Sequence, residues 1–216
     1  MHFNSLFFDL DDTLYPASSG LWDAIRQRMN EYMQGVVDLP LTEIVSLRKR
    51  YLEEYGTTLR GLQAHYDVDA DDYLDFVHDL PLEKYILPDP GLRNLLLGLP
   101  QKRWIFTNAD TNHAIRVLSI LGINECFTGI IDIRAMEFAC KPDKIAYQRA
   151  LAITAEEDPT QCVLFDDSFR NLSAARAMGF FTVLVGKNGQ NPSVDRTISS
   201  MHDLRVCIPE LWQKNN

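Results

Sequence analysis

The amino-acid sequence predicts an α/β protein, with a parallel sheet covered by helices and an all-α segment inserted after the first strand. Short apolar runs alternate with helical patterns from about residue 88 to the C-terminus, and such alternation is typical of a parallel sheet. The runs are apolar on both faces, as expected of strands that are buried on two sides. Residues 16–87 show helical periodicity and no convincing strand, which predicts a helical insertion.

Each predicted strand is a short apolar run that is followed by a turn or helix signal. The predicted strands are Ser5–Leu10, Arg103–Thr107, Gly129–Ile133, Cys162–Phe165 and Phe181–Val185. Helices between them are predicted from capping residues, such as Asp89 before Pro90 at a helix start and Gly122 after a helix end. The first predicted helix begins after Asp89 and ends near Gly98. The other three are Asp110–Leu121, Pro142–Ala152 and Phe169–Met178.

The overall charge limits the possible partners. Among 216 residues, 30 are acidic and 21 basic, and the formal net charge is −9. This acidity disfavours nucleic acid or an anionic membrane as a partner, and an anionic substrate would need a locally placed cation. The four cysteines show no CxxC spacing, which argues against a zinc site or a disulfide framework. Without a signal-peptide pattern or an 18-residue apolar run, we expect a cytoplasmic protein.

Polar side chains collect at the carboxyl ends of the predicted strands, where ligands bind in open α/β sheets. Three acids crowd after the first strand, and two carboxylates roughly 4 Å apart repel by about 4 kcal/mol at an effective dielectric of about 20. A cation must offset this repulsion. The residues at or after the strand ends are Asp9, Asp11, Asp12 and Thr13, then Thr107 and Asn108, then Lys141 after a loop, and then Asp166 and Asp167.

These residue types are suited to phosphate chemistry. Asp9 can attack phosphorus, because a carboxylate forms an acyl phosphate that water later hydrolyses. Asp11 can protonate the leaving oxygen and then deprotonate that water. Thr107 can donate its hydroxyl to a phosphate oxygen, and the backbone N–H of Asn108 can add a second hydrogen bond. Lys141 supplies a positive charge, and Mg²⁺ would neutralise the acids because it prefers oxygen ligands.

Four motifs occur in the order found in the haloacid dehalogenase superfamily, which the sequence resembles. They are DLDDT at residues 9–13, IFTN at 105–108, KPD at 141–143 and FDDS at 165–168. The resemblance implies a Rossmann-like core domain of residues 1–15 and 88–216, with a helical cap domain of residues 16–87.

The resemblance also implies a metal site. Asp9, Asp167 and the backbone carbonyl of Asp11 would bind Mg²⁺ directly, with Asp166 close to the metal or linked to it by water. Dehalogenating members lack an acid two residues after the nucleophile, so Asp11 implies hydrolysis of phosphate esters. Asn171 stands where many relatives carry an aspartate. Of the remaining acidic-cluster residues, Asp12 is expected to shape the turn and Thr13 to satisfy backbone groups there.

Longer stretches resemble the pyrimidine 5′-nucleotidase branch of that superfamily. They are YGTTLRGLQAHY at residues 55–66, LDDTLYP at 10–16, VHDLPL at 77–82 and DPGLRNLL at 89–96. The resemblance implies hydrolysis of a nucleoside 5′-monophosphate such as UMP or CMP. Thr57, Thr58 and Arg60 are candidate substrate contacts, although Thr57 equally suits a helix N-cap and Arg60 a surface ion pair.

Two other functions stay open. The first is a broad-specificity phosphatase acting on small molecules such as sugar phosphates or FMN. The second is a catalytically weak phosphate-binding or signalling protein, because receiver domains also combine clustered acids, a threonine and a lysine. Against the second, Asp9 ends the first strand here, whereas the phosphorylated aspartate of receiver domains ends a later one. A small phosphate ester is the expected partner, and both a monomer and a homodimer are compatible with the sequence.

Overall fold

The computed structural model describes residues 2–186 and 192–212, and the chain within it forms two units. One unit combines Met1–Ser19 with Ile86–Asn216, and the other is Gly20–Tyr85. In the described part of the chain, no helix combines the length and the apolar character that are needed to cross a membrane. That the larger unit is a core domain and the smaller one a cap domain stays a prediction.

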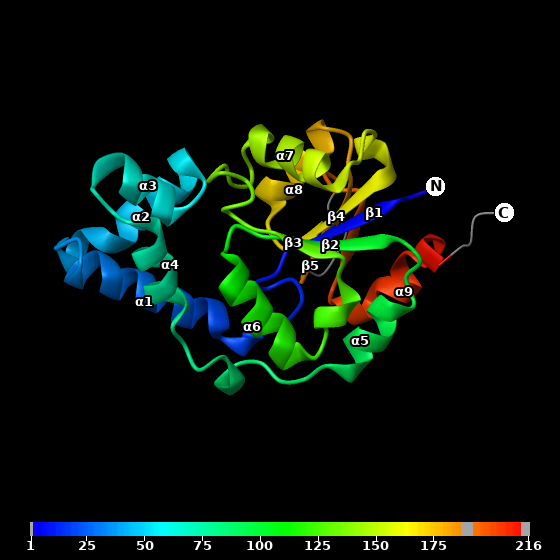
Figure 1. Cartoon of the computed structure of the whole chain (residues 1–216), viewed down its shortest axis with the longest axis horizontal. Coiled ribbons are helices and arrows are strands. Elements are labelled where there is room, and N and C mark those ends of the chain that lie inside the picture. Colours follow the sequence, from blue (N-terminus) through cyan, green and yellow to red (C-terminus); the bar gives the residue numbers. More distant parts are fainter. Residues whose placement is uncertain (1, 187–191, 213–216) are drawn as a thin grey trace. The chain divides into compact units, whose positions relative to one another are not determined.

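A parallel sheet forms the centre of the larger unit and confirms the predicted fold class (Figure 1). Over residues 2–186 and 192–212 it has six strands in the order β3-β2-β1-β4-β5-β6. The strands are β1 (Ser5–Phe8), β2 (Lys102–Phe106), β3 (Gly129–Ile131), β4 (Cys162–Asp166), β5 (Phe181–Val185) and β6 (Arg196–Ile198). The prediction missed β6, because only Ile198 of its three residues is buried and the segment lacks an apolar run.

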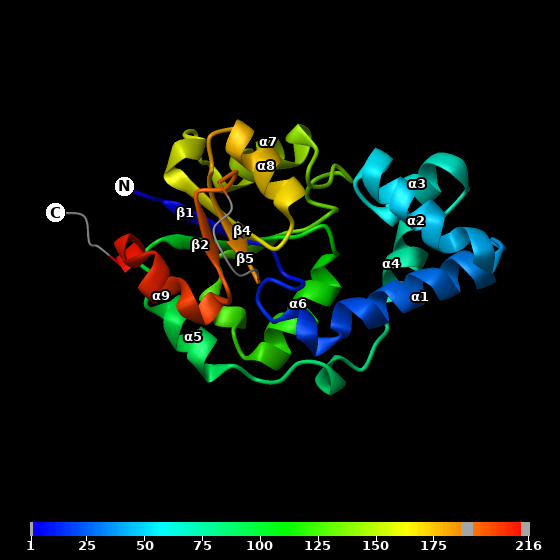
Figure 2. The ribbon, with the colours of Figure 1, turned by 180° about the vertical axis from the view of Figure 1, so that it is seen from behind.

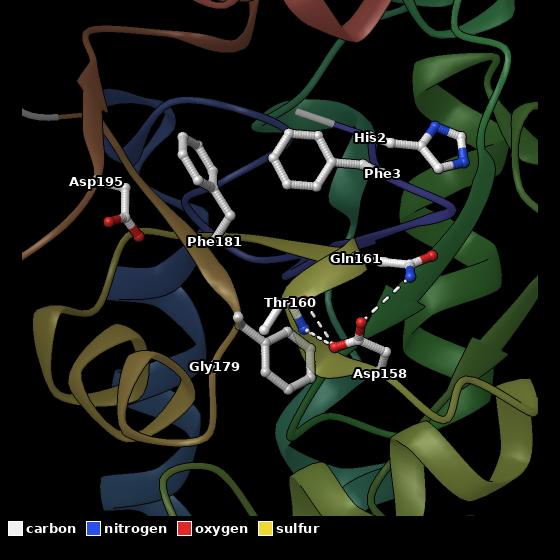
Figure 3. Close-up of a pocket in the computed structure, with 9 residues that line it drawn as sticks. His2, Phe3, Asp158, Thr160, Gln161, Gly179, Phe181 and Asp195 are labelled. Carbon is white, nitrogen blue, oxygen red and sulfur yellow. Dashed lines mark hydrogen bonds between the residues drawn. The ribbon is translucent and has the colours of Figure 1, made fainter. Parts of the chain in front are cut away.

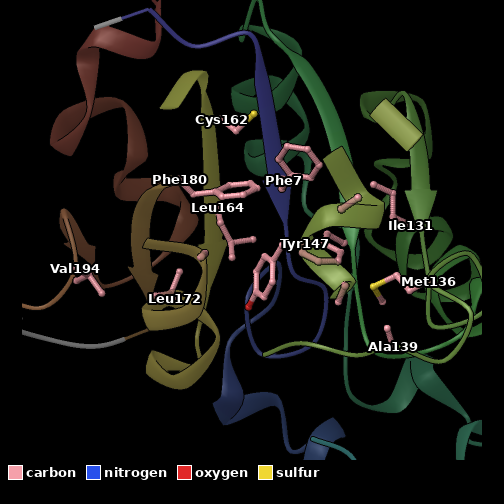
Figure 4. Close-up of a cluster of buried hydrophobic side chains, with 14 of the residues drawn as sticks. Phe7, Ile131, Met136, Ala139, Tyr147, Cys162, Leu164, Leu172, Phe180 and Val194 are labelled. Atoms are coloured by element: carbon pink, nitrogen blue, oxygen red, sulfur yellow. The ribbon is translucent and has the colours of Figure 1, made fainter. Parts of the chain in front are cut away.

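The two central strands are apolar on both faces because both faces are covered. Every residue of β1 is buried, and successive side chains of a strand point to opposite faces. The Phe8 ring therefore stacks on Phe165 at 4.6 Å, whereas the Phe7 ring meets Phe106 and Phe180 edge-on. Figure 4 shows the cluster around Phe7, to which Tyr147 contributes.

Helices cover the two faces of this sheet. α7 (Lys144–Thr154) and α8 (Phe169–Ala177) lie on one face, and α5 (Pro90–Leu97) and α6 (Thr111–Leu121) lie on the other (Figures 1 and 2). Short α9 (Leu204–Cys207) follows β6. Asp89 caps α5 as predicted, and Asp110, the predicted first residue of the next helix, is the N-cap of α6. Helix α7 begins later than predicted, because Asp143 precedes its first turn and accepts from the N–H of Ile145.

The strand order produces a switch point between β1 and β4. From β1 the chain continues to β2 and β3 on one side of the sheet, whereas β4 leads to β5 and β6 on the other. All neighbouring strands are parallel, so their carboxyl ends lie at one edge. Ligands of open α/β sheets bind in the crevice at such a switch point.

The second unit is all-α, as the periodicity predicts. Its helices are α1 (Leu21–Gly35), α2 (Leu41–Tyr55), α3 (Thr58–His65) and α4 (Ala70–His78). The Tyr32 ring of α1 meets the Tyr73 ring of α4 edge-on at 5.0 Å. α3 packs closely on α2, because a Cβ atom at Gly61 would lie 2.2 Å from Cγ of Tyr51.

Candidate active site

Three carboxylates meet at the switch point of the sheet. Asp9 directly follows β1, Asp166 ends β4, and Asp167 comes next. One carboxylate oxygen from each of the three residues lies within 4.8 Å of the other two. The register explains this grouping, because Phe8 pairs with Phe165 and the backbone N–H of Asp9 donates to the Phe165 carbonyl at 2.9 Å. Residues that are far apart in the sequence are thus brought together by strand pairing.

Lys141 is the cation within this cluster. Its Nζ lies 2.8 Å from Oδ1 of Asp9 and 2.8 Å from Oδ2 of Asp166, and the side chain is 1% exposed. Burial alone would lower the pKa of Lys141, but the charges and hydrogen bonds of Asp166 and Asp9 raise it above its ordinary value. Lys141 is therefore a charged ammonium group at neutral pH.

One ammonium group does not balance three carboxylates. Burial raises the pKa of Asp9 well above its ordinary value; Lys141 lowers this pKa, whereas Asp166 and Asp167 raise it further. A further cation would favour the ionised form of Asp9. The oxygen-only ligand set fits a hard divalent ion such as Mg²⁺, and Asp9, Asp166 and Asp167 could hold it.

Asp166 is held in place by several donors besides Lys141. The backbone N–H of Ser168 donates to its Oδ1 at 2.8 Å. The side-chain amide of Asn171 lies 3.1 Å from both carboxylate oxygens. Asn171, which stands where many superfamily members carry an acid, thus supplies a donor to Asp166 rather than a further negative charge.

The loop after β2 supports Lys141 from the backbone side. The Asn108 side chain accepts from the N–H of Lys141 at 2.8 Å and donates to its carbonyl at 3.0 Å. The Asn108 side chain is thus occupied by the Lys141 backbone, and a substrate contact through the backbone N–H of Asn108 stays a prediction. Thr107 is 2% exposed, and its hydroxyl oxygen accepts from the N–H of Ala109 at 3.0 Å. Its hydroxyl hydrogen can still be donated.

The turn after β1 differs in one respect from its prediction. The Thr13 hydroxyl donates to Oδ2 of Asp9 at 3.2 Å and so contacts a side chain of the acid cluster, not the backbone. This contact was missed because strand periodicity does not describe a turn in which positions four apart come together. Asp12 has a φ of 57°, and aspartate is one of the few residues that tolerate this left-handed conformation.

Asp11 has two partners that sequence reasoning missed. The Tyr15 hydroxyl donates to Oδ1 of Asp11 at 2.5 Å, and Nε2 of His113 lies 2.9 Å from the same oxygen. Burial and the nearby Asp11 carboxylate raise the pKa of Tyr15 well above its ordinary value, so that Tyr15 stays a neutral donor. A histidine on the buried face of α6 was a usable signal, because a buried imidazole needs a polar partner.

The three predicted substrate contacts, Thr57, Thr58 and Arg60, lie at the start of α3. Thr57 is the N-cap of α3, and its hydroxyl oxygen accepts from the N–H of Arg60 at 3.2 Å. Thr58 is 8% exposed, whereas Arg60 is partly exposed. Thr57 therefore fills the capping role that the sequence also allowed, and a substrate contact by any of the three residues stays a prediction.

A separate cavity of 420 Å³ lies at the other edge of the sheet (Figure 3). Its lining includes Asp158 and Gln161, which precede β4, and Phe181, which begins β5. Because the strands are parallel, this edge is opposite the acid cluster. The Asp158 carboxylate accepts there from the backbone N–H of Thr160 at 2.9 Å.

Comparisons with known proteins agree with this arrangement. The family model for haloacid dehalogenase-like hydrolases matches residues 3–179. The chain is 33% identical over 192 residues to "Phosphate metabolism protein 8" of Saccharomyces cerevisiae, an alignment that covers 82% of this chain and 60% of that protein. It is 28% identical over 163 residues to "Phosphatase MT3486" of Mycobacterium tuberculosis, covering 75% of this chain and 69% of that protein. The chain thus spans less than two thirds of the length of the yeast relative.

A solved structure shares the fold. The HAD-hydrolase YfnB of Bacillus subtilis, bound to magnesium, superposes with a TM-score of 0.59 at 17% identity and covers 95% of this chain and 98% of that chain. Identity at this level shows the fold alone. The family model, in contrast, covers most of the sequence. The matched residues include Asp9, Asp166 and Asp167, which meet at the switch point. The chain belongs to the family of haloacid dehalogenase-like hydrolases.

Proposed function

We propose that this hydrolase is a Mg²⁺-dependent phosphatase that cleaves small phosphate monoesters through an aspartyl-phosphate on Asp9. The observation that carries the proposal is the meeting of Asp9, Asp166, Asp167 and Lys141 at the switch point, with Asp11 two residues beyond the nucleophile. The relative from Mycobacterium tuberculosis carries the name phosphatase, which supports the same reaction class.

The reaction would take two steps. In the first, a carboxylate oxygen of Asp9 forms a bond to phosphorus, the ester bond breaks, and Asp11 gives a proton to the leaving oxygen. In the second, water gives a proton to Asp11 and bonds to phosphorus as the bond to Asp9 breaks. Thr107 and the backbone N–H of Asn108 would hold phosphate oxygens during both steps, and Lys141 would keep Asp9 ionised.

The metal site follows from the same residues. Asp9, Asp166, Asp167 and the backbone carbonyl of Asp11 would hold Mg²⁺, which when bound neutralises the acids and polarises the phosphoryl group. Without such a cation, the clustered carboxylates would repel an anionic substrate.

We propose a pyrimidine nucleoside 5′-monophosphate as the substrate, so that UMP or CMP is converted to the nucleoside and phosphate. The support is the resemblance of residues 55–66 and of three further stretches to pyrimidine 5′-nucleotidases. Thr57, Thr58 and Arg60 are the proposed contacts beyond the phosphate. Arg60 is the strongest of these candidates, because Thr57 caps α3 and Thr58 is buried within the helical unit.

A phosphate-release screen tests reaction class and substrate together. The panel contains UMP, CMP, purine nucleotides, sugar phosphates and FMN, each with Mg²⁺ and with a chelator. We expect release only with Mg²⁺, and the highest kcat/KM for UMP or CMP. Equal rates across the panel would favour the broad-specificity phosphatase instead. No release from any ester would favour the phosphate-binding or signalling function.

Substitution of the nucleophile tests the covalent mechanism. Asp9→Asn is expected to lose at least about 10³-fold in kcat, because an amide cannot form the acyl phosphate. Asp12→Asn is the matched control, since it removes a neighbouring charge and asparagine also tolerates a left-handed φ. An Asp9→Asn enzyme with wild-type turnover would refute the aspartyl-phosphate.

A further inference from the structure

Asp11 is held by residues that lie 4 and 102 positions away in the sequence. Tyr15 and His113 both contact Oδ1, at 2.5 and 2.9 Å. The His113 side chain is completely buried, and that of Asp11 is 13% exposed. Since an ionised carboxylate oxygen can only accept hydrogen bonds, Nε2 of His113 carries the hydrogen of this bond. Two donors from different parts of the chain therefore converge on a single carboxylate oxygen.

We propose that Tyr15 and His113 are positioning residues that orient Asp11 for proton transfer, and that the transferred proton is carried by Oδ2. This inference rests on the phosphatase function proposed above. A carboxylate oxygen offers two lone-pair directions, and the two donors occupy both of those of Oδ1. The proton given to the leaving oxygen, and later taken from water, is then bound to Oδ2.

The position of His113 is fixed by the start of a helix. His113 lies in the first turn of α6, where the Asp110 side chain accepts from its backbone N–H at 2.8 Å. The start of α6 is further held by Asp132, which accepts from the N–H and the hydroxyl of Thr111 at 2.9 and 2.7 Å. Figure 2 shows the segment after β1 running beside α6. Such support matters because a small misplacement of a catalytic group can cost about 10²-fold in rate.

Tyr15 contacts Asp11 within the turn that follows β1. Its side chain is buried, with 4% of the residue exposed, and its position four residues after Asp11 lets the hydroxyl reach back to the carboxylate. Substitution by phenylalanine removes a single oxygen atom and keeps the ring in place. Tyr15→Phe is therefore the mildest test of the proposal.

Esters with leaving groups of different acidity distinguish a positioning role of Tyr15 and His113 from a merely structural one. An aryl phosphate with a very acidic phenol, such as dinitrophenyl phosphate, needs little protonation of its leaving oxygen, whereas phenyl phosphate needs much more. The ratio kcat/KM reports the steps up to formation of the aspartyl-phosphate, in which Asp11 acts as the acid. A misdirected acid therefore slows phenyl phosphate selectively, whereas a general loss of structure slows all esters alike.

The experiment measures kcat/KM for dinitrophenyl, p-nitrophenyl and phenyl phosphate with Mg²⁺ in the wild type, Tyr15→Phe, His113→Leu and Asp11→Asn. Because general acid catalysis contributes roughly 10² to 10⁴ in rate, we expect Tyr15→Phe and His113→Leu to lose about 30-fold more with phenyl than with dinitrophenyl phosphate. Asp11→Asn should show the largest difference, and the double variant Tyr15→Phe/His113→Leu should approach it.

Two further variants control for packing. His113→Gln keeps an amide donor near the position of Nε2 and should restore most of the phenyl phosphate activity. His202→Leu removes another histidine–aspartate contact of 2.9 Å, to Asp89 at the start of α5, and should leave the leaving-group dependence of the wild type. If His113→Leu does not fold, Tyr15→Phe carries the test alone.

Equal losses of the Tyr15 and His113 variants on all three esters, or no loss, would overturn the positioning role while leaving the phosphatase function intact. A wild type that releases phosphate from none of the esters would contradict the proposed function itself, and the inference would fall with it. A selective loss on phenyl phosphate in both Tyr15→Phe and His113→Leu, with the second loss reversed by His113→Gln, supports the role of both donors.

Discussion

Lys141 lies between two acids that the pairing of β1 with β4 places side by side. Its Nζ contacts Asp9 and Asp166 at 2.8 Å each, and its side chain is almost completely buried. A buried charge is costly unless it is paired and hydrogen-bonded. Here the two carboxylates satisfy the ammonium group, and the ammonium group in turn reduces their repulsion.

Removal of the Lys141 charge is expected to affect both stability and activity. Lys141→Met should lower the free energy of unfolding by about 3 kcal/mol, because one partner of a buried ion pair is lost and the acids stay behind. Phosphate release should become undetectable. Thermal and urea unfolding measure the first effect. Lys144→Met, at an exposed position in the first turn of α7, is the control and should behave as the wild type.

Single residues differ in how far the sequence reveals their contacts. Asp9, Asp166 and Lys141 were predicted to meet, because each follows a strand or its loop in a recognisable motif, although their catalytic roles stay predictions. Tyr15 and His113 were missed as partners of Asp11. Both side chains are buried in the structure, and the local sequence does not say which polar atom a buried side chain will reach.

Helices and strands formed where capping residues and apolar runs indicate them. The start of α5 was predicted from the N-cap Asp89, whose side chain accepts from the N–H of Leu92. Asp110, predicted as the first residue of the next helix, is the N-cap of α6 and accepts from the N–H of His113. The strand β6 was missed because its three residues have no apolar pattern of their own. It exists through pairing with β5, in which Leu184 lies beside Thr197. Pairing with an existing sheet can therefore override a weak local signal.

The contact between α2 and α3 gives a testable limit on side-chain size. In Gly61→Ala the new Cβ would lie 2.2 Å from Cγ of Tyr51, so the helices must separate. We expect a loss of about 2 to 3 kcal/mol in unfolding free energy, as for other overpacked sites. Gly35→Ala is the matched control, because no atom lies within 4 Å of its added Cβ. Equal stabilities in urea unfolding would contradict this packing.

For the whole chain, the order of strands decides where the acids meet. The chain leaves the sheet after β1, returns for β2, and crosses to the other side of β1 only with β4. The carboxyl ends of β1 and β4 therefore flank the switch point, and Asp9 comes beside Asp166 and Asp167. A position of β4 that is not adjacent to β1 would separate the two halves of the acid cluster.

Metal binding should stabilise the whole protein through this cluster. Mg²⁺ at about 100 times its Kd adds roughly 2.7 kcal/mol to the unfolding free energy, which corresponds to a rise in Tm of about 5 to 10 °C for a chain of this size. A chelator should reverse the rise. Thermal unfolding with and without Mg²⁺ is the measurement.

Two variants assign the effect to the cluster. Asp167→Asn should lose most of the rise in Tm, because it removes one of the three carboxylates. Asp158→Asn, at the opposite edge of the sheet, should keep it. A rise of the same size in Asp167→Asn would place the bound metal elsewhere.

The fold class, the helical insertion and the residues at the strand ends were all determined by local signals in the sequence. Apolar runs, helical periodicity and capping residues act over a few positions, so they can be recognised without knowing the fold. Tertiary structure alone decided which polar atoms meet: Thr13 with Asp9, Asn108 with the backbone of Lys141, and Tyr15 and His113 with Asp11. These contacts depend on strand order, register and helix placement, which no short segment specifies by itself.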